Sequence, residues 1–146
     1  MYKRQRDRYT GFTEVLGELG VVVVAALGAH GARTARDLAL RLLTGRHPPT
    51  AIFAASDTQA FGVLAAARDL GIQVPSDLTV IGYDDILVAE SIGLTTIRQH
   101  LFESGRIGAE LLLAEIECRS PIPPVISLDP ELVIRATSAP PKEGRE

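Results

Sequence analysis

Short runs of apolar, often β-branched residues alternate along the chain with segments in which apolar residues recur every third or fourth position. The runs cover residues 21–26, 51–55, 78–83 and 94–97. A continuous apolar run of this length is typical of a strand that is buried on both faces of a sheet. The pattern therefore predicts buried strands at these places, with helices between them.

The segments between and after these runs have a helical period. Apolar residues at helical spacing predict helices over residues 8–19, 35–44, 57–70 and 101–117. Thr34 suits the N-cap of the second helix, and either Ser56 or Asp57 suits that of the third, because their side-chain oxygens can accept from a free backbone N–H. Residues 125–127 and 132–136 are predicted to be extended.

Strand and helix alternate from residue 21 to residue 71, which predicts an α/β fold with a parallel sheet and right-handed crossovers. In such sheets ligands bind beyond the carboxyl ends of the strands. Polar residues follow the predicted strands, namely His30, Ser56, Asp57, Tyr83, Asp84, Asp85, Arg98, Gln99 and His100. The sequence thus predicts a core of strand bodies and a crevice that these side chains border.

Composition narrows the class of protein. A chain of 146 residues, 46% hydrophobic and 23% charged, fits one folded domain rather than a disordered segment. Its net charge of −3 does not indicate an overall basic surface of the kind that binds nucleic acid. No apolar run reaches the roughly 18 residues of a membrane helix, and no targeting signal is visible. We therefore expect a soluble protein without a membrane partner.

Catalytic motifs are missing from the sequence. It contains no nucleophile elbow, no P-loop and no complete dinucleotide fingerprint, and its histidines lack metal-ligand spacing. We expect no enzymatic activity, no metal and no cofactor. One alternative is a small α/β enzyme that uses Asp57, Asp84 and Asp85 around Mg²⁺. A metal cage needs more oxygen ligands than the adjacent Asp84 and Asp85 supply, so this pair favours a turn.

Several segments, in order along the chain, resemble those of one protein family. They are "RYTGF" (8–12), "TAIFAASDTQAFGVLAAARDLGIQVPSDLTVIGYDD" (50–85), "LTTIRQ" (94–99) and "LVIRATS" (132–138). Together they resemble the effector-binding domain of bacterial transcription regulators of the lactose/galactose-repressor type. The resemblance extends from Arg6 to Ser138 and implies a periplasmic-binding-protein-like fold of type I.

In that family two α/β subdomains close on a small effector, often a sugar or a nucleobase, and this changes DNA binding by a homodimer. The resemblance implies a partial sensor domain at 6–138. Within it, 6–97 would be the second subdomain, 100–128 pieces of the first, and 129–138 a return to the second, before a mobile tail at 139–146. We expect a cytoplasmic, N-terminally truncated regulator that contacts DNA only through a helix-turn-helix absent from this sequence.

The resemblance also implies which residues bind the effector. Arg8 matches the family's ligand-contacting arginine, and Asp57 matches an aspartate that hydrogen-bonds effector hydroxyls or ring nitrogens. His30 falls near the position of an aromatic residue that stacks on the ligand. Gln99 lies where the chain crosses between the subdomains, and Arg6 is a further candidate.

Three more expectations follow from the resemblance. Asp84 and Asp85 should shape the turn after their strand more than they contact the ligand. Residues 101–117 and 125–128 should lack sheet partners. Their apolar side chains should therefore be poorly buried, in particular Leu111, Leu112, Ile116 and Val125. A periplasmic sugar-binding protein of a transport system shares the fold and is the alternative function.

Overall fold

The computed structural model describes residues 3–26, 31–117 and 125–140. Its helices are α1 (Lys3–Glu18), α2 (Ala32–Leu43), α3 (Asp57–Asp69), α4 (Leu87–Ser91) and α5 (Leu101–Ile116). Its strands are β1 (Ala51–Phe53), β2 (Thr79–Ile81), β3 (Thr96–Arg98) and β4 (Glu131–Val133). Within the described ranges, none of the helices combines the length and the apolar character that crossing a bilayer requires.

The strands lie side by side in the order β1, β2, β3, β4. β1 pairs with β2 in parallel, and β3 pairs with β4 antiparallel. Isolated parallel bridges from Ile81 to Thr95 and from Asp84 to Arg98 connect the two pairs. The carboxyl ends of β1, β2 and β3 therefore meet at one edge, which confirms the predicted α/β fold with a parallel sheet. β4 is an antiparallel addition at the side.

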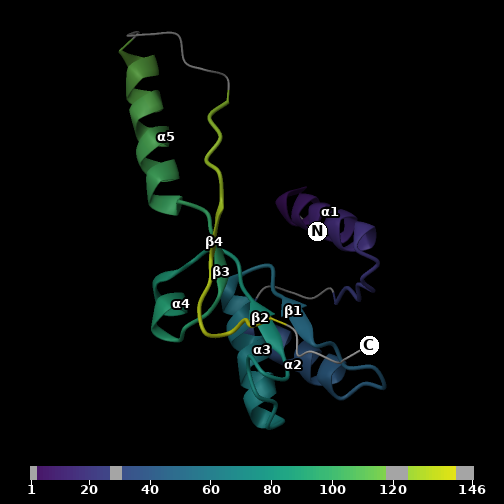
Figure 1. Cartoon of the computed structure of the whole chain (residues 1–146). Coiled ribbons are helices and arrows are strands. Elements are labelled where there is room, and N and C mark those ends of the chain that lie inside the picture. The colour runs from purple at the N-terminus through teal and green to yellow at the C-terminus, as the bar shows by residue number, and fades with distance from the viewer. Residues whose placement is uncertain (1–2, 27–30, 118–124, 141–146) are drawn as a thin grey trace.

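The core lies where α2 and α3 pack against each other and α3 packs against β2 (Figure 1). Leu78, Val80 and Leu94 are fully buried there. Gly62 lets the two helices approach closely, because a Cβ on it would lie 2.1 Å from the carbonyl oxygen of Ala32. The apolar runs thus form the core that the sequence predicted, apart from the first run.

Residues 21–26 do not form a strand, so that prediction was wrong. The segment has no regular secondary structure, and Val22 and Val24 are 89% and 70% exposed. Gly20, with φ 69°, ends α1, and the Val21 N–H donates back to the Leu16 carbonyl at 2.9 Å. A strand needs a paired neighbour as well as β-branched residues, and none of the described strands pairs with this segment.

The helix caps were only partly predicted. Ser56 is the N-cap of α3, where its hydroxyl accepts from the Gln59 N–H at 3.3 Å, so Asp57 is not the cap. Thr34 was wrongly predicted as a cap, because α2 begins earlier, after Gly31. Gly31 has φ 139°, a conformation open mainly to glycine, and this lets the helix begin there. The short helix α4 was not predicted.

Helix α5 and residues 125–130, which we call the arm, leave the remaining elements, which we call the body (Figure 1). No residue of α5 is buried. Leu112, Ile116 and Val125 are 62%, 68% and 79% exposed, and Leu111 is half-buried. The expected poor burial of these residues is confirmed.

Candidate functional site

The polar residues that follow β1, β2 and β3 come together at the carboxyl ends of these strands. Asp57 opens α3 after β1, Tyr83 and Asp84 follow β2, and Gln99 follows β3. Arg8 reaches the same place from α1. The predicted border of a crevice is therefore present, with an added contribution from a helix outside the sheet.

Arg8 makes three kinds of contact at this edge. Its guanidinium donates to the Ala55 carbonyl oxygen at 3.0 Å and to Gln99 Oε1 at 3.3 Å. The guanidinium carbon also lies 3.7 Å from the centre of the Tyr83 ring, within the range of a cation–π interaction. Arg8 thus joins the ends of all three parallel strands, while its side chain stays only partly buried.

An aromatic contact anchors α1 beside β1. The ring of Phe12 stacks on that of Phe53 with their centroids 5.0 Å apart. Phe53 in turn meets the edge of Tyr83 at 6.4 Å. The two rings hold α1 in the place from which Arg8 can reach the strand ends.

Gln99 extends the contact from Arg8 to Asp84. Its Nε2 donates a short hydrogen bond to Asp84 Oδ1. Burial raises the pKa of the Asp84 carboxyl; Arg8 opposes this rise, the charge of Asp57 adds to it, and Gln99 opposes it, with a net increase. Arg8, Gln99 and Asp84 form a half-buried polar chain from three separate segments, and together they offer hydrogen-bond donors and an acceptor to a small molecule.

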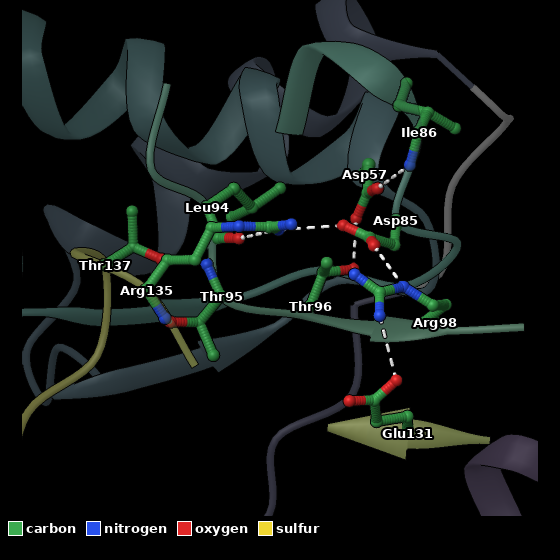
Figure 2. A network of polar contacts seen from close by, with 10 residues as sticks. All are labelled: Asp57, Asp85, Ile86, Leu94, Thr95, Thr96, Arg98, Glu131, Arg135 and Thr137. Atoms are coloured by element: carbon green, nitrogen blue, oxygen red, sulfur yellow. Dashed lines mark hydrogen bonds and ion pairs between the residues drawn. The ribbon is translucent and has the colours of Figure 1, made fainter. Parts of the chain in front are cut away.

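Asp57 lies beneath this chain and is fully buried. Its Oδ2 accepts from the Ile86 N–H at 2.9 Å and its Oδ1 from the Thr96 hydroxyl at 2.5 Å, as Figure 2 shows. Its backbone N–H donates to the Tyr83 carbonyl at 2.7 Å. Asp57 is therefore bound to the segment that carries Asp84. Contact between its carboxylate and a ligand stays a prediction.

The segment after β2 is a tight turn with an unusual backbone. Asp84 has φ 125° and Asp85 has φ 55°, a region that residues with a Cβ rarely adopt. Gly82 is required for a different reason, since a Cβ on it would lie 2.3 Å from Asp57 Oδ1. Asp84 and Asp85 thus form the turn, as expected, whereas the expectation that they contact the ligand less stays a prediction. The structure adds the contact of Asp84 with Gln99.

Asp85 binds two arginines on the other side of the turn (Figure 2). Its side chain is 8% exposed and accepts from Arg98 Nε at 2.7 Å and Arg135 Nη1 at 2.8 Å. Burial acts to raise the pKa of Asp85, but hydrogen bonds from Arg135 and Arg98 hold it below its ordinary value. Arg98 also contacts Glu131 at 2.9 Å, so this cluster joins the turn to both β3 and β4.

Sequence reasoning missed Arg135. Besides Asp85, this residue donates to the Leu94 carbonyl at 2.8 Å. The available signal was a cation inside the apolar extended segment "LVIRATS", where a charge needs a partner once it is buried.

One predicted site residue, Arg6, is not brought into this group. Arg6 is exposed on α1. His30 lies outside the residues that the structure describes. An open depression of about 370 Å³ adjoins the group on the side of α5, and its lining comprises Asp84, Asp85, Arg98, His100, Leu101, Phe102 and Glu103.

The magnesium alternative finds no ligand set in the structure. Among the described residues, no three His, Cys, Asp or Glu side chains converge closely enough to hold a metal ion. The oxygens of Asp57 and Asp85 already accept from protein donors.

Comparisons with known proteins now place this geometry in a family. A model of the periplasmic binding protein-like domain matches residues 2–138. The chain is 34% identical to the HTH-type transcriptional repressor PurR of Vibrio vulnificus over 137 matched residues. The matched region covers 90% of this chain and 41% of the repressor. The chain thus spans less than half the length of this curated relative.

Solved structures of transcription regulators also match this chain over most of its length. A LacI family transcriptional regulator from Enterococcus faecium with bound ribose matches with a TM-score of 0.84 and 29% identity, over 92% of this chain and 52% of that one. Another from Arthrobacter, in complex with lactose, matches with a TM-score of 0.79 and 32% identity, over 87% and 48%. The chain therefore belongs to the periplasmic binding protein-like domain family and is related within it to the LacI-type transcription regulators.

Proposed function

We propose that this chain is the effector-sensing part of a bacterial DNA-binding transcription regulator. It would recognise a small molecule, a sugar or a related metabolite, and control operator binding without catalysing a reaction. The named relatives support this, because one is a transcriptional repressor and two regulator structures hold ribose or lactose. In this proposal the whole protein is a cytoplasmic homodimer that contacts DNA through a helix-turn-helix segment.

The observation that carries the proposal is the polar chain of Arg8, Gln99 and Asp84. It contains one cation, one carboxyl and one amide, all half-buried, on segments that are far apart in the sequence. A ligand with several neighbouring hydroxyls can donate to the carboxyl and accept from the guanidinium and the amide. Such a set favours a neutral polyhydroxy molecule over a strongly charged one.

The remaining predicted residues have different positions in this proposal. Asp57 supports the group from beneath, and Arg6 and His30 stay as predicted effector contacts on the basis of the family resemblance. Gln99 is followed directly by His100 and then by α5. A ligand that binds better when Gln99 is in one arrangement would shift the population of conformations in which α5 takes a given position relative to the body.

Titration of ribose and of lactose into the protein tests the effector site. Arg8→Ala and Gln99→Ala should each weaken binding by about tenfold to a hundredfold, as expected for a lost hydrogen bond that involves a charged group. Arg41→Ala is the matched control, because Arg41 is exposed on α2 away from the strand ends. Sugar binding that is unchanged in both site variants would contradict the assignment.

A periplasmic sugar-binding protein of a transport system remains the alternative function. The regulator relatives argue against it. Sequencing the gene upstream of Met1 separates the two functions, since an in-frame helix-turn-helix indicates a regulator and a secretion signal indicates a transport protein.

A further inference from the structure

We propose that Asp57 is a positioning residue that holds the Asp84 turn in the arrangement that binds the effector, without contacting the effector itself. This inference rests on the proposed function, since it concerns the same site. It differs from the role that the family resemblance implies for Asp57, which is a direct hydrogen bond to the ligand.

The contacts of Asp57 enclose the turn. Its backbone N–H donates to the Tyr83 carbonyl, and its Oδ2 accepts from the Ile86 N–H, so one residue binds both ends of the segment that contains Asp84. Its Oδ1 accepts from the Thr96 hydroxyl, which fixes the turn relative to β3. These bonds join three elements that are far apart in the sequence.

The backbone of the turn needs such support. Asp84 and Asp85 both have positive φ, and conformations of this kind persist only where the surroundings hold them. Arg98 and Arg135 hold the side chain of Asp85. Asp57 holds the backbone of the turn through its bonds to Tyr83 and Ile86, from the N-terminus of α3.

Burial leaves the Asp57 carboxylate no route to a ligand. The residue is 0% exposed, and Gly82 lies so close that a Cβ on it would stand 2.3 Å from Oδ1. Asp84, in contrast, is half-buried and already contacts Gln99. The geometry therefore makes Asp84 the carboxyl that meets the effector and Asp57 the carboxyl that positions it.

The test compares two substitutions at Asp57. Asp57→Asn keeps both side-chain bonds, because its amide oxygen can accept from Ile86 and its NH₂ can donate to the Thr96 hydroxyl, which can turn to accept. Asp57→Ala loses both. We expect Asp57→Ala to weaken ribose or lactose binding by about tenfold or more, and Asp57→Asn to stay within about threefold of the wild type. Asp37→Ala, at an exposed aspartate on α2, is the control.

Amide hydrogen exchange at Ile86 and NMR titration of Asp84 need no ligand. Exchange at Ile86 should accelerate in Asp57→Ala and remain slow in Asp57→Asn. The pKa of Asp84 should fall in Asp57→Asn, since the charge of Asp57 helps to raise it. If Asp57→Ala does not fold, Thr96→Val removes one of the bonds and should show a smaller loss of affinity with intact Ile86 protection.

Two results would overturn the inference. One is a loss of sugar affinity in Asp57→Asn as large as in Asp57→Ala while Ile86 stays protected, because that pattern indicates direct contact. The other is unchanged Ile86 exchange in Asp57→Ala. If the wild type binds neither sugar, that result counts against the proposed ligand class, and the exchange experiment still decides the role of Asp57.

Discussion

Helix α3 of the body has buried residues along its length, including Ala60, Val63 and Ala66, whereas α5 of the arm has none. Yet α5 is the longer of the two helices and the richer in leucine. The difference lies in their partners. α3 packs against α2 and β2, while the apolar side chains of α5 remain largely exposed. An apolar helical period therefore determines that a helix forms, and tertiary partners determine whether it is buried.

Each region is stabilised in its own way. Full burial of one large apolar side chain contributes roughly 1.5–3 kcal/mol, so the body holds most of the folding free energy. In the arm, Arg106 contacts Glu103 and Glu110 one turn away on either side, which supports the helix locally. We expect the arm to open before the body does.

The largest effect should come from matched leucine truncations. Leu78 is fully buried in the body, and Leu112 in the arm is 62% exposed. Leu78→Ala should lower the free energy of unfolding by about 2–5 kcal/mol, because it removes apolar contacts and leaves a cavity. Leu112→Ala should change it by less than about 0.5 kcal/mol. Urea unfolding of both variants measures this, and equal losses would contradict the division into body and arm.

A paired glycine experiment should give the next largest effect. Gly62→Ala places a methyl group against the backbone of α2 and should destabilise the body by roughly 1–3 kcal/mol. Gly105→Ala on α5 has open space around the new Cβ and should raise stability or helicity by up to about 1 kcal/mol. In thermal unfolding, the melting temperature should fall in Gly62→Ala and should stay the same or rise in Gly105→Ala. An unchanged melting temperature in Gly62→Ala would show that α2 and α3 can move apart to make room for the methyl group.

Acid should weaken the ion pairs within the body that hold the Asp85 turn to β3 and β4. The pKa of Asp85 is lowered in the folded state, so its carboxylate stabilises the fold above its unfolded pKa of about 3.9 and loses this effect as the pH falls through the folded pKa. Asp84 acts in the opposite sense, because its raised pKa means that the fold prefers the protonated form. In Asp85→Asn the midpoint of urea unfolding should decrease less as the pH is lowered than it does in the wild type. In Asp84→Asn the midpoint should decrease more. Identical acid profiles for the two variants would refute the opposed signs.

The smallest effect should come from the exposed ion pairs of the arm. Arg106→Ala removes both contacts with Glu103 and Glu110. Helicity measured by circular dichroism should fall slightly at low salt, and the difference from the wild type should vanish at high salt, because exposed pairs are screened. A salt-independent loss would mean that Arg106 contributes through packing of its side chain.

Sequence reasoning succeeded where local pattern and tertiary context agree. β1, α3 and β2 were predicted because apolar runs, a cap and a helical period follow one another from residue 51 to residue 81. It failed at residues 21–26, because β-branched residues indicate the tendency to form a strand but not the presence of a neighbour. α4 was missed because a helix of this length shows too little periodicity.

The candidate site was predicted in its location more than in its details. The rule for parallel sheets predicted the edge where the polar residues meet, and the family resemblance named Arg8 and Gln99, which contact each other there. Binding of an effector by these residues stays a prediction. The family resemblance implied that Asp57 contacts the effector and that Asp84 mainly shapes the turn, and we propose the opposite assignment, which the sequence could not give because both residues follow apolar strands. Only the three-dimensional neighbours distinguish them. Thr96 and Ile86 surround Asp57, whereas Gln99 and Arg8 lie next to Asp84.

The register of β3 and β4 has a topological consequence. Arg98, the last residue of β3, is paired with Glu131, the first residue of β4. The two strands are therefore antiparallel neighbours joined by the connection from residue 99 to residue 130, which contains α5. Loop-closure entropy grows slowly with the length of a flexible connection, by about 0.6 kcal/mol per doubling. Lengthening the connection beyond α5 should therefore have little effect on the pairing of the two strands.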